Sequence, residues 1–181
     1  MFPSLVRTVG VAALFCSVFA GAAFADDGAE INRLFRTGQA AEAFTRLDRL
    51  LAERPKDAPL RFLKGVLLAD SGRPAEAQLV YQQLTVDYPE LPEPHNNLAV
   101  LYAAQGDYAR ARAALETALR ASPGYAVAHQ NLADVYVQLA RQSYAEAQRL
   151  DPSNSTIGPK LALLRQLSPT APSSPASGAK P

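Results

Sequence analysis

The sequence predicts an all-α protein, a solenoid of antiparallel helix pairs closed by a C-terminal capping helix. The first observation is a period of 34 residues that three residue types keep independently; such a period is typical of stacked helical units. The second is that apolar residues within each period recur at three- and four-residue steps, the spacing of one helix face. The positions that keep the period are Gly38, Gly72 and Gly106, Ala43, Ala77 and Ala111, and Pro55, Pro89 and Pro123.

The N-terminal segment, residues 1–25, has the pattern of a cleaved secretory signal peptide. Arg7 precedes an uncharged apolar run, and the small residues Ala23 and Ala25 stand just before the acidic pair that begins at Asp26. That order of charge, apolar run and small residues is the layout of an export signal, and the run is short for a membrane span. We therefore expect cleavage after Ala25 and export to the periplasm, with a retained membrane anchor as the alternative.

The first three units, 24–57, 58–91 and 92–125, are each predicted to be a pair of helices. In the third unit, Gly106 separates two apolar helical faces and Pro123 ends the second of them. A helix pair of this size cannot bury its apolar side alone, so the units must stack on one another. In the first unit, only the second helix has a convincing pattern.

The fourth unit, residues 126–152, departs from the period. Pro152 arrives five residues earlier than the period requires, and the stretch before it contains neither Gly nor Pro. One apolar face continues through that stretch at helical steps. We therefore predict one long helix at about 126–150, with a shortened helix pair that turns near Arg141 to Tyr144 as the alternative.

The next segment, residues 153–167, is predicted to hold a short capping helix at about 158–167. A terminal repeat needs such a cover, because its apolar side would otherwise be exposed. The apolar residues that can share one face of this segment are Ile157, Leu161, Leu164 and Leu167. The final residues, 168–181, are rich in Pro, Ser and Ala without apolar periodicity, and we expect this tail to be disordered.

Composition and charge argue against several classes of function. The chain has 18 Lys plus Arg against 17 Asp plus Glu, interspersed rather than clustered, which is unlike a nucleic-acid-binding surface. The only cysteine, Cys16, lies in the predicted signal, so neither a disulfide nor a thiolate is expected. His95 and His129 are the only histidines, and no metal-ligand or nucleophile motif accompanies them. We therefore expect no enzyme activity, no metal, no cofactor, no nucleic-acid partner and no membrane span after signal cleavage.

The third unit carries the residues by which the chain resembles a known family, the tetratricopeptide repeat. The matching residues are Ala99, Tyr102, Gly106, Asp107, Tyr108, Ala111, Leu115, Ala118 and Pro123. The resemblance covers about residues 26–152, in the manner of a small exported bacterial member of the family. It implies a right-handed α-solenoid whose first helices line a concave groove, and a protein or peptide ligand bound there.

Positions that face the groove in the family can be carried over to this chain residue by residue. The candidates are Asn32 and Arg36 in the first unit, Phe62 and Val66 in the second, Asn96 and Asn97 in the third, and Gln130, Asn131 and Asp134 in the fourth. Asn97 and Asn131 hold the same position in adjacent units, and an amide can pair with the N–H and the C=O of a bound peptide at once. The alternative for these two is a bond to a neighbouring turn, and for Phe62 and Val66 it is core packing.

The expected function is a non-catalytic protein–protein interaction module or scaffold of the cell envelope. It would bind a peptide segment of a partner in the concave groove. The cations with which some family members hold a C-terminal carboxylate are absent, so that ligand is not expected. The alternatives are a self-associating structural subunit, as a homodimer, and a regulatory accessory of an envelope enzyme complex.

Overall fold

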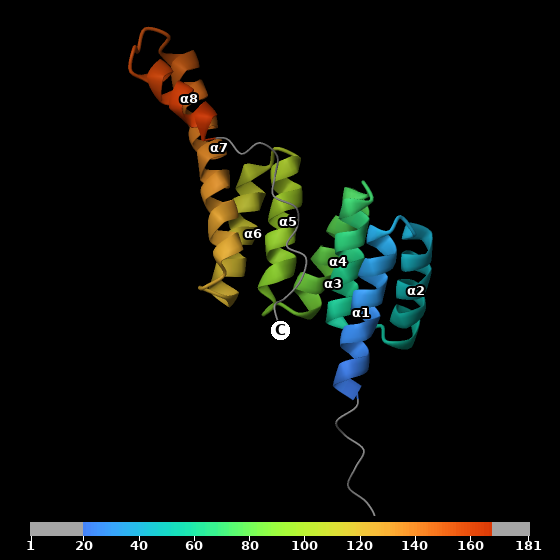
Figure 1. The fold of residues 1–181 in the computed structure, drawn as a ribbon. Helices are drawn as coiled ribbons and strands as arrows, with labels where there is room; N and C mark the ends of the chain where they lie inside the picture. Colours follow the sequence, from blue (N-terminus) through green and yellow to red (C-terminus); the bar gives the residue numbers. More distant parts are fainter. Residues whose placement is uncertain (1–19, 168–181) are drawn as a thin grey trace, which may run out of the picture. The chain divides into compact units, whose positions relative to one another are not determined.

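The computed structural model describes residues 20–167, and every regular element in this range is a helix (Figure 1). The helices are α1 (Ala20–Arg36), α2 (Ala40–Glu53), α3 (Ala58–Asp70), α4 (Pro74–Asp87), α5 (Pro92–Ala104), α6 (Tyr108–Ala121), α7 (Ala126–Leu150) and α8 (Ile157–Gln166). The predicted signal peptide lies mostly outside the described residues, although α1 begins before the predicted cleavage point. The predicted disordered tail lies wholly outside them.

The chain divides into two compact parts, an N-terminal part of residues 1–43 and a C-terminal part of residues 44–181. In the N-terminal part, the side chains of Ile31 and Leu34 on α1 are buried, and so is Ala43 at the start of α2. The N–H of Gln39 donates to the carbonyl oxygen of Leu34 at 2.9 Å, which closes the turn after α1. The structure therefore has a helix on each side of this turn, α1 before it and α2 after it.

The three glycines that keep the period all adopt the left-handed backbone conformation. Their φ angles are +81° at Gly38, +72° at Gly72 and +77° at Gly106. A residue with a Cβ atom is strained there, whereas glycine is not. The glycine period is thus a period of helix ends, because each of these residues turns the chain from the first helix of a pair into the second.

The core of the C-terminal part, residues 44–181, follows the same period of 34 residues. The helix α3 packs against α4 and α5 against α6, while the pairs stack through contacts of α4 with α5 and of α6 with α7 (Figure 1). On the second helix of each pair, the fully buried positions lie 34 residues apart. They are Ala77, Tyr81 and Leu84 on α4, and Ala111, Leu115 and Ala118 on α6. Each pair therefore buries its apolar side against its neighbours, as a stack of repeats requires.

The fourth unit contains one continuous helix, α7, with no turn near Arg141, as the uninterrupted pattern predicts. It packs against α5, α6 and α8. The short helix α8 lies beside the C-terminal part of α7 (Figure 1). Ile157 and Leu161 are buried in that contact, but Leu167 is 62% exposed, so the apolar face predicted for the capping segment is covered only in part.

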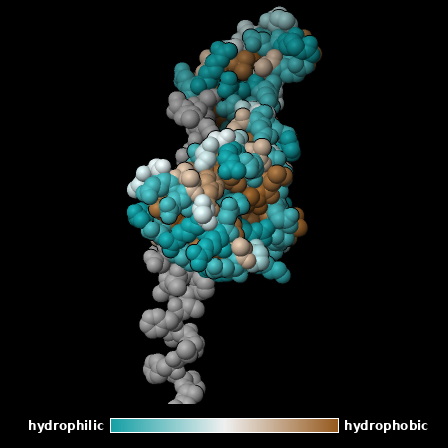
Figure 2. Space-filling view, turned by 90° about the vertical axis from the view of Figure 1, so that its right-hand side faces the viewer, coloured by the Kyte–Doolittle hydropathy of each residue, from teal (hydrophilic) through white to brown (hydrophobic). Residues whose placement is uncertain are grey.

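The surface is mostly hydrophilic, and on the face drawn in Figure 2 the hydrophobic residues gather mainly in one patch. Ion pairs link neighbouring helices: Arg61 on α3 pairs with Asp87 on α4 at 2.6 Å, and Lys64 on α3 pairs with Asp48 on α2 at 2.7 Å. Within residues 20–167, no helix combines the length and the apolar character needed to cross a bilayer.

Candidate functional site

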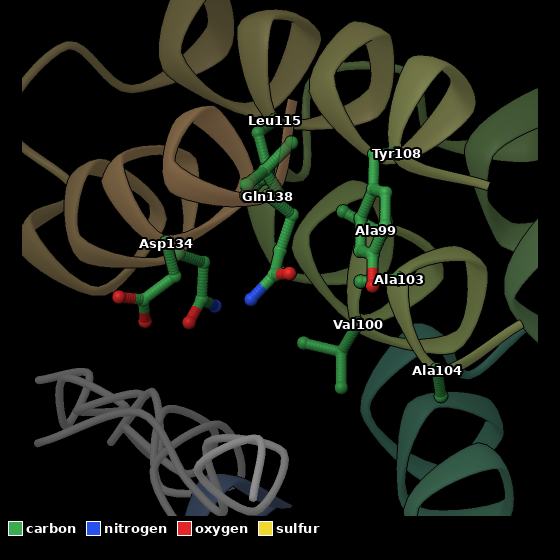
Figure 3. A pocket seen from close by; sticks show the side chains of 10 residues that line it. Ala99, Val100, Ala103, Ala104, Tyr108, Leu115, Asp134 and Gln138 are labelled. Atoms are coloured by element: carbon green, nitrogen blue, oxygen red, sulfur yellow. The ribbon is translucent and has the colours of Figure 1, made fainter. Parts of the chain in front are cut away.

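The main candidate site is a pocket between α5, α6 and α7, with a volume of about 220 Å³ (Figure 3). Its floor is apolar and made by small and aliphatic side chains, which leave room between the helices. The ten lining residues are Ala99, Val100, Ala103 and Ala104 of α5, Tyr108 and Leu115 of α6, and Asn131, Asp134, Val135 and Gln138 of α7. The pocket lies where the first helices of the third and fourth units meet, the face on which the family resemblance puts the groove.

The polar side of the pocket comes mainly from α7. Asn131, Asp134 and Gln138 follow at three- and four-residue steps and so lie on one face of that helix. Asp134 and Gln138 extend from α7 on one side of the opening, and Val100 extends from α5 on the other (Figure 3). Asp134 is half-buried and is the only charged residue among those that line the pocket. The pocket therefore combines an apolar floor with a polar edge, a combination common in ligand sites.

A chain of side-chain hydrogen bonds runs inward from this pocket, and we call it the amide chain. Asn131 Nδ2 donates to Asn96 Oδ1 at 2.9 Å, Asn96 Nδ2 donates to Asn97 Oδ1 at 3.2 Å, and Asn97 Nδ2 donates to the Tyr81 hydroxyl at 3.0 Å. Burial raises the pKa of Tyr81, so its hydroxyl stays protonated over the whole physiological range. The amide chain thus ties three helices, α7, α5 and α4, from three successive units.

The amide chain corrects the expectation for Asn96 and Asn97. Their side chains are 0% and 1% exposed, so neither presents an amide to an open groove. Asn97 does not make the alternative bond to a neighbouring turn either, because its amide bonds to the Tyr81 side chain of the preceding repeat. Asn131 differs from Asn97 although it holds the same repeat position: it is half-buried and lines the pocket.

The remaining predicted residues fall into different environments. Val66 is buried at 5% exposure, and the half-buried Phe62 ring packs against Tyr81 with a centroid distance of 5.6 Å, so both follow the core-packing alternative. Gln130 is exposed and does not line the pocket. Asn32 is half-buried and Arg36 is exposed, and both belong to the N-terminal part, residues 1–43. Of the nine predicted residues, the pocket brings together Asn131 and Asp134.

Sequence reasoning missed Tyr108 and Gln138 as pocket residues. Tyr108 opens the second helix of its pair, whereas the groove positions that the family resemblance implies lie on first helices only. Gln138 lies one helical turn beyond Asp134 and reaches the pocket because α7 continues without a break. The uninterrupted pattern of residues 126–150 was therefore the signal that could have found Gln138.

The two histidine side chains differ in burial and in hydrogen bonding. The Nε2 atom of His129 is 2.9 Å from the carbonyl oxygen of Pro123, the proline that ends the preceding unit. His95 is half-buried, and its Nε2 atom is buried with no hydrogen-bond partner in the part of the chain that the structure describes. Within residues 20–167, no three His, Cys, Asp or Glu side chains are grouped closely enough to hold a metal ion.

We expect His95 to make the fold less stable as the pH falls below neutral. Burial lowers the pKa of His95; the Pro89 carbonyl opposes this shift, and the positive charge of Arg120 adds to it. As the pH falls, the unfolded chain therefore binds a proton at this residue before the folded chain does. The contribution of neutral His95 to the free energy of unfolding is fully present above the ordinary pKa of 6.5, and it is lost as the pH falls through the lower pKa of the folded chain.

Urea unfolding between pH 8 and pH 5 measures this effect. The His95→Gln variant should lose part of the pH dependence, because glutamine does not titrate. Equal slopes for the parent chain and His95→Gln would contradict the role given to His95.

Comparison with known proteins gives a family and several relatives. The family model described as tetratricopeptide repeat matches residues 34–101 and 102–150, more than half of the chain. The protein named Probable biofilm formation methyltransferase WspC from Pseudomonas aeruginosa is 37% identical over 91 residues, which cover 50% of this chain and 22% of that protein. The protein of the same name from Pseudomonas putida is 36% identical over 93 residues, with coverages of 51% and 22%. The chain therefore spans about a fifth of the length of these relatives.

Two solved structures share the fold. One is pilF of Pseudomonas aeruginosa, with a TM-score of 0.58 and 18% identity over 81% of this chain and 69% of that one. The other is a structure of Naa15/Naa10 bound to HypK-THB, with a TM-score of 0.54 and 18% identity over 79% of this chain and 22% of that chain. At this level of identity the likeness concerns the fold alone, and it confirms the all-α solenoid class that the sequence predicts.

Proposed function

Because the chain belongs to the tetratricopeptide repeat family, whose repeats serve protein–protein interaction, we propose that its pocket binds a peptide segment of a partner protein. The observation that carries this proposal is the pocket between α5, α6 and α7, with its apolar floor and its polar edge. A floor of this kind accepts an apolar part of a peptide, while the edge fixes its direction.

The hydrogen-bonding state of the edge supports a peptide as the ligand. Asn131 uses an N–H to bond Asn96, which leaves its Oδ1 atom to accept from a ligand. Gln138 uses its Oε1 atom to accept from Arg141 Nη1 at 3.0 Å, which leaves its Nε2 atom to donate. These two amides therefore offer one acceptor and one donor, and a peptide unit has one N–H and one C=O to match them.

In this proposal the chain itself performs no chemistry. The chain matches 22% of the length of the two proteins named as methyltransferases, a share too small to carry their activity over. Binding at the pocket requires shape and hydrogen bonds only. The proposal also includes export to the cell envelope, which rests on the pattern of residues 1–25; N-terminal sequencing of the protein isolated from its native cell tests cleavage after Ala25.

We expect the Ala104→Trp variant to lose its partner. Ala104 is exposed at the pocket, so an indole there should cover the floor without straining the core. Mild crosslinking of the tagged protein in its native envelope fraction, followed by quantitative mass spectrometry, should recover partners with the parent chain and about tenfold less with the variant.

The matched control is Ala113→Trp, since Ala113 is also an exposed helical alanine but does not line the pocket. Recovery with this variant should equal that of the parent chain. Equal recovery with Ala104→Trp would show that partners bind elsewhere and would exclude the pocket.

A second candidate, self-association, is favoured by one observation. Three large apolar side chains near the end of the described chain are strongly exposed: Leu150 is 69%, Leu163 61% and Leu167 62% exposed. Apolar surface of this kind is a common feature of interfaces. Static light scattering over a range of concentrations distinguishes a homodimer, in which these residues meet a second copy, from a monomer that binds a different protein.

A further inference from the structure

We propose that the pocket selects a partner segment with a basic side chain, lysine or arginine, whose charged end pairs with Asp134. This inference rests on the proposed peptide-binding function and names the chemistry of the ligand. The ligand's aliphatic stem would lie on the apolar floor, and its cation would sit at the polar edge of α7. Three features of the pocket carry the inference.

The first feature is that Asp134 lacks a counter-charge. Several acidic side chains on the helices of residues 44–167 pair with a basic one, as Asp48 does with Lys64, Asp87 with Arg61 and Glu146 with Arg149. Asp70 on α3 and Glu93 on α5 share with Asp134 the lack of an ion pair within the described residues. Asp134 makes no ion pair with any residue between 20 and 167, although it is half-buried beside apolar atoms. A carboxylate in that setting loses hydration without gaining a partner, and a cation supplied by a ligand would offset this loss.

The second feature is the shape and chemistry of the floor. Ala99, Val100 and Ala103 provide an apolar strip on α5 that faces the polar residues of α7 (Figure 3). A lysine or arginine side chain has an apolar stem and a charged end, so it buries the stem on such a surface while the charge stays near water. The Tyr108 ring also lines the pocket, and the face of a tyrosine ring attracts a cation.

The third feature is that none of the ten residues that line the pocket is Lys, Arg or His. The Arg141 guanidinium lies next to this lining and donates to Gln138 Oε1 at 3.0 Å. The amide chain also holds Asn131 with its Nδ2 atom turned toward Asn96, so that its oxygen remains for the ligand. An acidic ligand side chain beside Asp134 would meet its carboxylate with no basic lining residue to balance the two charges, which disfavours that class of peptide.

A phage-displayed library of random 12-residue peptides, selected on the full chain, tests the inference. Selected peptides should be enriched in Lys or Arg at one position relative to the unselected library. For the strongest binder, replacing that residue by norleucine, which keeps the stem and removes the charge, should weaken binding about fivefold in fluorescence anisotropy. The Asp134→Asn variant should bind the two peptides equally, and the control Glu90→Gln, an exposed site away from the pocket, should still distinguish them.

A charge reversal sharpens the result, because it does not depend on the loss of binding alone. The Asp134→Lys variant should prefer the same peptide with Glu in place of its basic residue, by about fivefold. Far-ultraviolet circular dichroism of each variant checks that the helices are intact. Half-buried Asp134 is not part of the core, so its replacement should leave the fold unchanged.

The failure of this inference is distinguishable from the failure of the proposed function. If the lysine and norleucine peptides bind the parent chain equally, and Ala104→Trp weakens both, the pocket binds peptides but the charge preference is overturned. If no peptide is selected either by the full chain or by a chain that ends at residue 167, peptide binding itself is overturned. Selection of basic peptides by the shortened chain but not by the full chain would assign the pocket to the protein's own tail and would overturn the assignment to a partner.

Discussion

Replacing Asn97 with alanine is expected to lower the free energy of unfolding by about 3 kcal/mol. The variant removes the middle of the amide chain, so Asn96 Nδ2 loses its acceptor and the Tyr81 hydroxyl loses its donor. All three side chains are at most 1% exposed, and water cannot replace the lost bonds without opening the core. Urea unfolding followed by circular dichroism measures the change.

Two matched variants separate this effect from a general loss of packing. Tyr81→Phe removes one hydroxyl at the end of the amide chain and should cost about 1 kcal/mol. Asn131→Ala removes the half-buried outer end, where water can reach Asn96 more readily, and should also cost about 1 kcal/mol. An equal loss for Asn97→Ala and Asn131→Ala would contradict the assignment of Asn97 to the interior.

Replacing Gly65 with alanine is expected to lower the free energy of unfolding by about 3 kcal/mol. A Cβ atom at Gly65 would lie 2.7 Å from Cζ of the Tyr81 ring, which is too close for two carbon atoms. The ring is 1% exposed and is held by the bond from Asn97, so it has no free space into which to move. The sign is informative, because alanine inside a helix normally stabilises it relative to glycine.

The third repeat supplies the compensating substitution. One period after Gly65 stands Ala99, and one period after Tyr81 stands Leu115. A larger side chain on the second helix thus goes with a smaller one on the first. The double variant Gly65→Ala with Tyr81→Leu should recover part of the lost stability, apart from the cost of unpairing Asn97.

Gly124→Ala, where nothing lies within 4 Å of the new Cβ atom, is the control and should change stability little. If Gly65→Ala lowered the free energy of unfolding no more than Gly124→Ala does, the close contact between residue 65 and the Tyr81 ring would be contradicted.

The candidate site was less predictable than the fold because repeat position does not fix burial. Asn97 and Asn131 hold one position, yet Asn97 is buried against Tyr81 of the preceding unit, whereas Asn131 has Leu115 at the equivalent place and keeps one edge in the pocket. A tyrosine offers a hydroxyl for an amide to bond, and a leucine does not. The identity of one residue in the preceding helix therefore decided which asparagine a ligand can reach.

The sequence by itself determined the helices and their order, because the features that set them are local. The glycines at 38, 72 and 106 end first helices through a backbone conformation that only glycine adopts without strain, and the lack of Gly and Pro in residues 126–150 keeps α7 unbroken. Only the tertiary structure decided that Asn96 and Asn97 are interior and that Asp134 faces a pocket without a counter-charge. Both outcomes depend on which side chains from neighbouring units meet, and no single repeat contains that information.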